Sequence, residues 1–263
     1  MRARVTAAIE LQVDSDADVV LSIAAASGWT DDERLQVRTT AGVLPVNESV
    51  DHHGGRLHRV TLPVGHVRID YDAEVTSPTA PAPSDELDAV RYLRPSRYVP
   101  SDALGDGIPN FGGAAPRELV SLVPQWVADA LSYVSGSSGP TDTALDTLRS
   151  REGVCRDYAH VTIALLRALG VPARLVSVYA PGLSPMDFHA VVEAFVDGRW
   201  EVVDTTRLAP RPHFVRIATG RDAADTAFLT TLSGTMTLSS VEVSAVAIGA
   251  FTTDDHRGAV LLP

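Results

Sequence analysis

"GVCRDYAHVTIALLRALGVP", residues 153–172, contains the one cysteine of this 263-residue chain. The second half of the stretch is almost entirely apolar, which predicts a buried helix that begins at Cys155. Gly170 followed by Pro172 is a typical helix stop. A thiol in the first turn of such a helix feels the positive end of the helix dipole. Cysteines in that position, with a basic partner nearby, have pKa values in the range of roughly 3.5–7.5.

Two interpretations of Cys155 compete. A single thiol cannot form a disulfide within the chain, and a lone cysteine on a helix is most often a small buried hydrophobe. A nucleophilic cysteine needs a base beside it. The helix alone therefore favours the structural interpretation, and the decision depends on the residues that follow.

A β-hairpin is predicted downstream in "FHAVVEAFVDGRWEVVDTT", residues 188–206. The Asp-Gly pair at 197–198 between two β-like runs is a strong hairpin signal. Pairing outward from that turn places His189 and Asp204 on one face as diagonal neighbours, about 7–8 Å apart at Cα. We expect this face to pack on the Cys155 helix and to bring the imidazole to the thiol. His189 would then remove the thiol proton, Asp204 would orient the imidazole, and Cys155 would attack an acyl carbon.

The remainder of the chain divides at a change of pattern. Residues 1–75 read as short alternating strands, which predicts an N-terminal β-sandwich domain over 1–78. The stretch 76–86, rich in proline, serine and alanine, reads as a linker or as a connection held against the fold.

The second predicted domain spans 79–263 and begins with helices. One helix, or two short ones, is predicted over 116–134, because Pro124 interrupts the apolar pattern. Another is predicted over 141–150, with Thr141 or Asp142 as its cap. Strands follow the Cys155 helix. Helices first and antiparallel strands after them indicate an α+β fold.

Composition excludes several classes of partner. The formal net charge of −11 argues against a nucleic-acid groove and against an anionic membrane surface. No stretch approaches the roughly 20 apolar residues that a membrane helix needs. The N-terminal residues lack the pattern of a signal peptide, and the single cysteine suits a reducing cytoplasm, which is the expected location.

The sequence resembles the transglutaminase-like superfamily. The resemblance rests on the glycine-x-cysteine helix, "LLRALGVPAR" after it, the histidine strand, and the "WEVVDTT" strand, and covers about residues 85–232. Two further stretches, 92–102 and 216–228, resemble a bacterial subfamily with an N-terminal β-domain. Members of the superfamily include transglutaminases, peptide N-glycanases and bacterial cysteine proteases. Where many relatives have tryptophan after "HA", this chain has Val191.

The resemblance implies a papain-like catalytic core, with helices packed on an antiparallel sheet. It also implies that Cys155, His189 and Asp204 are the catalytic triad. The backbone N–H of Cys155 is expected to be one oxyanion donor on geometric grounds. Relatives supply a second donor from an upstream side chain, for which Gln125, Trp126 and Tyr133 are the candidates.

The sequence therefore predicts a cysteine-dependent enzyme that acts on amide bonds of peptides or proteins through a thioester, without a cofactor. With water as acceptor it is a protease or amidase, and with an amine it is a transglutaminase. Hydrolysis is favoured because water needs no second substrate site and none is visible in the sequence. A non-catalytic binding module on the same fold is the alternative from another class.

Histidines elsewhere receive structural interpretations. His52, His53 and His58 cluster with Asp51 in "DHHGGRLH". A metal site is conceivable there, but the stretch reads more simply as a polar hairpin loop, so no metal ligand is predicted. His160 lies five residues after Cys155, on a different side of the helix, and is expected to serve in packing.

Overall fold

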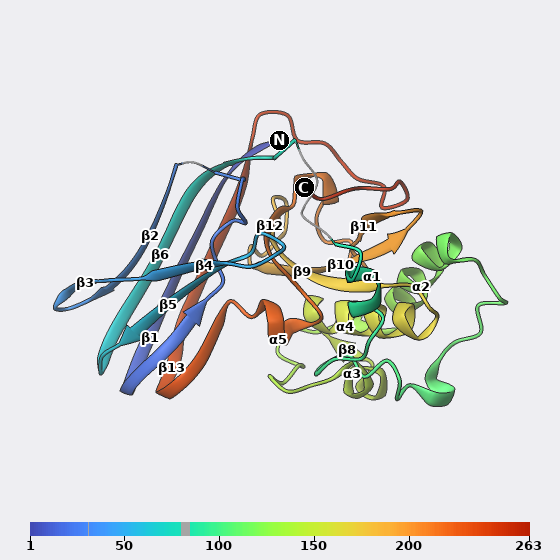
Figure 1. Ribbon diagram of the computed structural model, residues 1–263, viewed down its shortest axis with the longest axis horizontal. Coiled ribbons are helices and arrows are strands. Elements are labelled where there is room, and N and C mark those ends of the chain that lie inside the picture. Colours follow the sequence, from blue (N-terminus) through green and yellow to red (C-terminus); the bar gives the residue numbers. More distant parts are fainter. Residues whose placement is uncertain (31, 80–84) are drawn as a thin grey trace.

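The computed structural model describes residues 1–30, 32–79 and 85–263. A large curled sheet lies on one side of the molecule, and a smaller sheet covered by helices lies on the other (Figure 1). The predicted linker at 76–86 falls partly on residues 80–84, which lie outside the described ranges.

The large sheet has seven strands, and the long first strand is its centre. On one side β1 pairs along its whole length with β13. On the other side β1 pairs first with β6 and then with β5, and β2 and β4 lie beyond these. The strands are β1 (Arg2–Leu21), β2 (Asp32–Thr39), β3 (Gly42–Leu44), β4 (Asn47–Val50), β5 (Arg56–Leu62), β6 (Gly65–Thr76) and β13 (Leu229–Ile248).

The predicted two-sheet β-sandwich is wrong, because residues 1–78 contribute their strands to one continuous sheet. The pairing of β1 with β13 shifts register between Val13 and Val19, where residues 14–16 of the strand are exposed. The sheet as a whole is curled (Figure 1). The apolar face of this sheet packs against residues of the smaller sheet, among them Val176 and Val178. The division at residue 78 stays a prediction, but the sheet takes β13 from far beyond it.

The smaller sheet is antiparallel and runs in the order β11-β10-β9-β12. The predicted hairpin is confirmed: Phe195 lies opposite Trp200, and Glu193 lies opposite Val202. Asp197 and Gly198 both have positive φ, as the two central residues of a type I′ turn require. The strands are β9 (Ala173–Tyr179), β10 (Phe188–Val196), β11 (Arg199–Val203) and β12 (Val215–Gly220).

Three longer helices cover one side of the smaller sheet (Figure 1). They are α2 (Pro116–Ala130), α3 (Ala144–Ser150) and α4 (Cys155–Ala168). α2 is one helix that includes Pro124. The cap of α3 is Thr143, whose side chain accepts from the Asp146 amide, and not the predicted Thr141 or Asp142.

Short elements complete the fold. They are the helices α1 (Asp88–Arg91) and α5 (Ala223–Thr226), the 3₁₀ turns at 105–107 and 211–213, and the strands β7 (Ser132–Tyr133) and β8 (Glu152–Gly153). β7 and β8 form a small parallel pair that sets Tyr133 beside Gly153. None of the helices in the described ranges has the length and hydropathy needed to span a bilayer.

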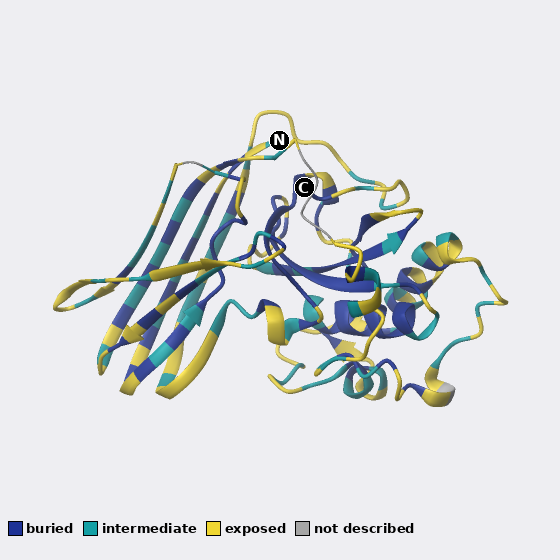
Figure 2. Ribbon diagram, viewed as in Figure 1, coloured by how far each residue is buried: buried dark blue, intermediate teal, exposed yellow. Residues whose placement is uncertain are grey.

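The two faces of the smaller sheet belong to different apolar cores. Val176, Val178 and Val191 join the core under the large sheet. Leu175 and Val192 join the helical core around α4. Buried on both faces, β9 has no exposed residue (Figure 2). The predicted α+β architecture of helices on an antiparallel sheet is confirmed.

Candidate active site

Cys155 is the first residue of α4, and the rest of that helix anchors it. From Asp157 to Arg167 every residue of α4 is buried. The helix ends in a Schellman motif: Gly170 has φ 82°, its amide donates to Arg167, and the Val171 amide donates to Leu166. A helix fixed along its length and at its end holds the thiol in a defined position.

The approach to α4 explains the glycine two residues before the cysteine. The Asp157 carboxylate accepts from the Val154 amide at 2.8 Å and from Ser138 Oγ at 2.9 Å. A Cβ on Gly153 would lie 2.6 Å from the Asp157 Cβ, closer than side chains approach. Gly153 is therefore required for this tight turn into the helix.

His189 and Asp204 form a buried pair at the end of the hairpin. His189 Nε2 lies 3.2 Å from Asp204 Oδ2, and both side chains are 1% exposed. Thr206 holds the other carboxylate oxygen, because its hydroxyl and amide donate to Asp204 Oδ1 at 2.6 and 3.0 Å. With Nε2 turned to Asp204, Nδ1 is the ring nitrogen left for the thiol.

Cys155 and His189 line the same cavity, and the thiol is close enough to act on the imidazole. Burial alone lowers the pKa of His189, but the Asp204 carboxylate and the contact with Cys155 outweigh burial and raise that pKa to about 10. The same pairing lowers the pKa of Asp204 against the opposing effect of burial. An imidazolium between a carboxylate and a sulfur is thereby favoured at neutral pH.

The predicted packing of the His189 face of the hairpin on the Cys155 helix is wrong. The face of β10 that packs on α4 carries Val192 and Ala194, whereas Val191 faces the core of the large sheet. His189 and Cys155 meet because each lies at the beginning of its element, the second residue of β10 and the first of α4. The contact is made beside the helix–sheet packing and not across it.

Cys155 and His189 line a cavity of about 350 Å³. Cys155 is partly exposed there, so a ligand can reach the sulfur. The walls combine aromatic rings with a few polar groups, and the lining includes Ser138, Arg156, Asp187, Phe188, Thr226 and Phe228. The stacked rings of Phe188 and Phe228, with centroids 5.4 Å apart, form one side.

Of the three oxyanion candidates, only Tyr133 lies beside Cys155. It is close enough to Cys155 for the two groups to interact, and burial and the nearby sulfur raise the pKa of Tyr133 to about 12. Trp126 lies against the Arg151 guanidinium in a different cavity. Gln125 bonds Asp129 and accepts from Arg207 at 2.8 Å, in a cavity on the far side of Asp204.

His160 has a role that periodicity alone does not indicate. It is fully buried, and its Nε2 accepts from the Ala223 amide at 3.1 Å. Burial lowers its pKa to about 3, so the ring is neutral and can accept that bond. Because Ala223 and Thr226 line the Cys155 cavity, His160 holds one wall of it. The expected packing role is therefore joined by a specific hydrogen bond.

A buried charged network, which no local sequence pattern predicts, links β9, β10 and β12. Glu193 accepts from Arg174 at 2.7 Å and from Arg216 at 2.6 Å, and all three side chains are 1% exposed. Although burial acts in the opposite direction, the two guanidinium groups lower the pKa of Glu193 to about 2. The direct pairing of Glu193 with Arg174 across β10 and β9 was not predicted, because only tertiary structure sets those strands side by side.

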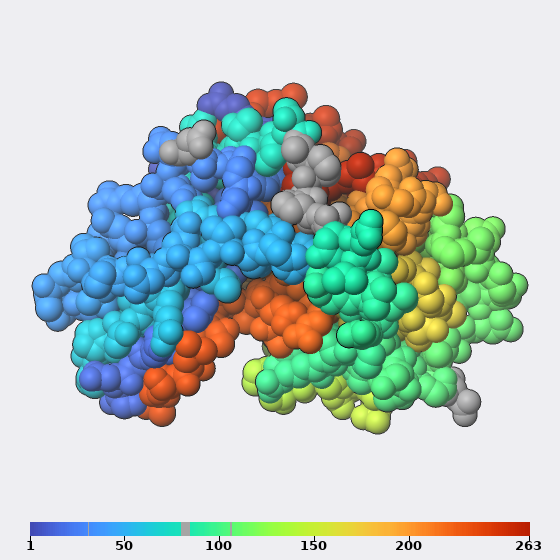
Figure 3. Space-filling model, viewed as in Figure 1, coloured from blue at the N-terminus to red at the C-terminus, as the bar shows by residue number. Residues whose placement is uncertain are grey.

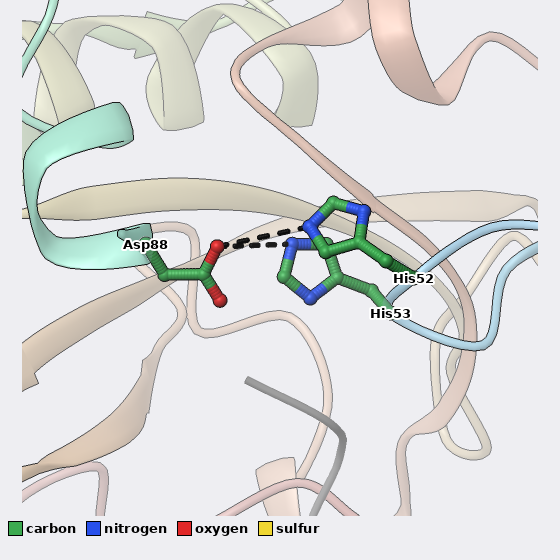
Figure 4. Close-up of side chains that lie close together, drawn as sticks. All are labelled: His52, His53 and Asp88. Carbon is green, nitrogen blue, oxygen red and sulfur yellow. Dashed lines mark ion pairs between the residues drawn. The ribbon is translucent and has the colours of Figure 1, made fainter. Parts of the chain in front are cut away.

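The N-terminal histidines form a separate cluster. The Nε2 atoms of His52 and His53 both lie 3.7 Å from Asp88 Oδ1 (Figure 4). Asp88 also pairs with Arg91 and lies 3.7 Å from Arg174. Two arginines already balance the carboxylate, so the cluster is an ion-pair network that joins a loop of the large sheet to α1.

The other two residues of the sequence cluster do not join it. His58 lies 2.9 Å from Glu48, and Asp51 accepts from the amides of its own turn, at His53 and Gly55. The turn at 52–53 is the loop between β4 and β5.

Comparison with known proteins places this geometry in a family. Residues 110–205, which include the whole Cys155–His189–Asp204 constellation, match the model of the transglutaminase-like superfamily. A crystal structure from Cytophaga hutchinsonii, described as a "Putative Cysteine Protease", superposes with a TM-score of 0.86 at 31% identity, covering 100% of this chain and 98% of that one.

Curated relatives are uncharacterized mycobacterial proteins. One from Mycobacterium leprae is 31% identical over 159 residues, 54% of each chain. One from Mycobacterium tuberculosis is 33% identical over 97 residues, 37% of this chain and 27% of that one. The matched parts span about half the length of these relatives or less. Sequence and structure together show that the chain belongs to the transglutaminase-like superfamily.

Proposed function

We propose that the protein is a cysteine-dependent hydrolase that cleaves amide bonds of peptides or proteins through a thioester. The observation that carries the proposal is the contact of the Cys155 side chain with His189, whose far nitrogen is held by Asp204 in a buried pair. The thiol opens on a cavity, so the reacting groups and a binding space coincide.

The proposed reaction follows from these positions. The Cys155 sulfur attacks the amide carbon, and the oxygen of the tetrahedral intermediate carries the negative charge. His189 gives its proton to the amine as the carbon–nitrogen bond breaks, which leaves a thioester. His189 then takes a proton from water, the hydroxide adds to the thioester, and the carboxylic acid leaves as the thiol is restored.

The acceptor is proposed to be water, and a transglutaminase activity would need an amine to enter the same cavity. We also propose that the protein works in a reducing compartment such as the cytoplasm. There Cys155 would stay reduced and available for the reaction.

Alkylation of the single cysteine tests the proposed pairing without a known substrate. An ordinary thiol with a pKa of about 8.5 reacts roughly tenfold more slowly for each unit of pH below that value. Because the pKa of His189 is raised, its imidazolium persists through neutral pH, and iodoacetamide should modify Cys155 at similar rates from pH 6 to 8. At pH 6 we expect His189→Gln to be about 100-fold slower than the wild type.

The rates are measured by intact mass, with His66→Gln as the matched control, because His66 is a half-exposed histidine on β6 of the large sheet. A wild-type rate that falls with pH like that of a small thiol would contradict the proposed ion pair.

Tyr133 is proposed as the second oxyanion donor. Its raised pKa keeps the phenol protonated, so it can donate its O–H to the developing oxyanion. Tyr133→Phe is expected to lower kcat by about 10²-fold with little change in KM. The matched change Trp126→Phe should leave kcat within a factor of about two, and equal losses in the two variants would exclude this role.

A further inference from the structure

The carboxylate of Asp187 lines the same cavity as Cys155 and His189. Asp187 lies two residues before His189, immediately before β10, and its Oδ1 accepts from the Phe188 amide at 2.7 Å. Its charge acts on both His189 and Tyr133, the two groups that flank the thiol. Asp187 is therefore the acidic group at the mouth of the catalytic cavity.

The His189 imidazolium acts on Asp187 and lowers the pKa of its carboxyl, but that ring is already paired with Asp204. Within residues 1–30, 32–79 and 85–263, no arginine or histidine forms an ion pair with Asp187. The residue as a whole is exposed, yet burial of its carboxyl in the cavity raises the pKa of Asp187. A partly desolvated carboxylate that has no salt bridge of its own is stabilised when a cation comes within ion-pair distance.

Arg156, the one arginine that lines the cavity, is already engaged. Its Nη2 donates to Ser138 Oγ at 2.6 Å and to the Gly139 carbonyl at 2.9 Å. Its Nε lies 3.8 Å from the buried Asp157 carboxylate. The uncompensated charge of the cavity is therefore negative.

We propose that Asp187 is a specificity residue that binds a cationic group of the substrate, an ammonium or a guanidinium next to the amide that Cys155 attacks. The inference rests on the proposed function. The aromatic side formed by Phe188 and Phe228 suits the aliphatic stem of a lysine or arginine side chain, whose charged end then reaches Asp187. A cavity of about 350 Å³ holds one such side chain.

Charged thiol reagents test this subsite directly. Methanethiosulfonates transfer their thioalkyl group to a thiolate: a disulfide forms with Cys155, the reagent's S–SO₂ bond breaks, and methanesulfinate leaves. The probes are the cationic trimethylammonioethyl, the anionic sulfonatoethyl and the neutral methyl reagents. Because Cys155 is the one thiol, the mass of the intact protein reports its modification alone.

We expect the cationic reagent to react faster than the anionic one, and Asp187→Asn to reduce that ratio by about tenfold. Asp187→Glu keeps the charge and should preserve most of the ratio. Asp14→Asn, which removes an equal charge from the exposed bend of β1, should leave the ratio unchanged. A ratio that falls equally in Asp187→Asn and Asp14→Asn would overturn the inference, since only the net charge would then matter.

The same experiment separates the two proposals. If the neutral reagent modifies Cys155 at pH 6 no faster than a small thiol, the proposed function fails. If the neutral reagent reacts fast but Asp187→Asn does not change the charge ratio, the function stands and the subsite is wrong.

Peptide amides extend the test to the source of the cation. N-acetylated peptides with lysine, norleucine or glutamate beside the scissile amide are compared with unblocked peptides. For a side-chain cation, Asp187→Asn should lower kcat/KM about tenfold for lysine and leave norleucine within a factor of about two. If Asp187 instead binds the α-amino group, Asp187→Asn should lower kcat/KM for the unblocked peptides and leave it unchanged for the N-acetylated ones. Equal losses on all peptides would contradict a charge subsite.

Discussion

Cys155→Ala is expected to abolish turnover of every amide that the wild-type protein cleaves, lowering kcat by at least about 10⁴-fold. Cys155 is the chain's one thiol, so no other cysteine can take over the attack. Its sulfur is also the atom in contact with His189. Activity is measured on a panel of peptide, glutamine and isopeptide amides, and the variant's unfolding by urea is recorded beside it.

The control for this prediction is stability. Cys155 is partly exposed at the first residue of α4, so its replacement by alanine opens no buried cavity. We expect the free energy of unfolding to change by less than about 1 kcal/mol. Full activity in Cys155→Ala would refute the covalent mechanism. If activity is lost, the urea measurement shows whether the variant is still folded, so that unfolding can be excluded as the cause.

Glu193→Ala is expected to destabilise the protein by about 3–5 kcal/mol, a large part of the stability of an ordinary domain. The change removes the carboxylate that Arg174 and Arg216 share and leaves both guanidinium groups buried without it. Arg216 also donates to the carbonyls of Leu262 and Pro263, so the loss should loosen the C-terminal residues from the sheet. Urea unfolding at pH 7 measures the effect.

Glu74→Gln provides the matched control on the large sheet. Glu74 pairs with Arg2, and both side chains are about half exposed. Exposed pairs contribute about 0–1 kcal/mol, so the control should change the free energy of unfolding by no more than that. Losses of similar size in the two variants would show that burial of the Glu193 network does not matter to stability.

The Glu193 network also makes the stability of the fold depend on pH. Because the folded-state pKa is about 2, below the ordinary value of 4.5, the carboxylate stabilises the fold fully above pH 4.5. That stabilisation is lost as pH falls from 4.5 through about 2. Glu193→Ala should therefore show a weaker loss of stability than the wild type between pH 5 and 2.

The Cys155 helix and the hairpin over residues 188–206 could be predicted because short local sequence patterns specify them. The helix from Cys155 was readable because a run of apolar residues ends at Gly170 and Pro172. The hairpin was readable because Asp197-Gly198 supplies two residues that tolerate positive φ. With the turn known, strand geometry set the register, and the register set His189 beside Asp204.

The predicted β-sandwich of the first part of the chain was wrong because its strands pair with a strand far away in the sequence. Alternating strands indicate buried and exposed faces, but they do not say which strands pair. β13 joins β1 from more than two hundred residues away, and this pairing makes one curled sheet from what read as a sandwich of local strands. The core under that sheet is completed by Val176 and Val178 of the smaller sheet.

The amino-acid sequence by itself determined where Cys155, His189 and Asp204, the proposed nucleophile, base and orienting carboxylate, stand, because each depends on a helix start or a turn a few residues away. Only the tertiary structure decided which groups surround them. Tyr133 reaches Cys155 through the pairing of two-residue strands, and Asp187 lines the cavity without a salt bridge because Arg156 is held by Ser138. Contacts of this kind depend on elements distant in the chain, and no local pattern specifies them.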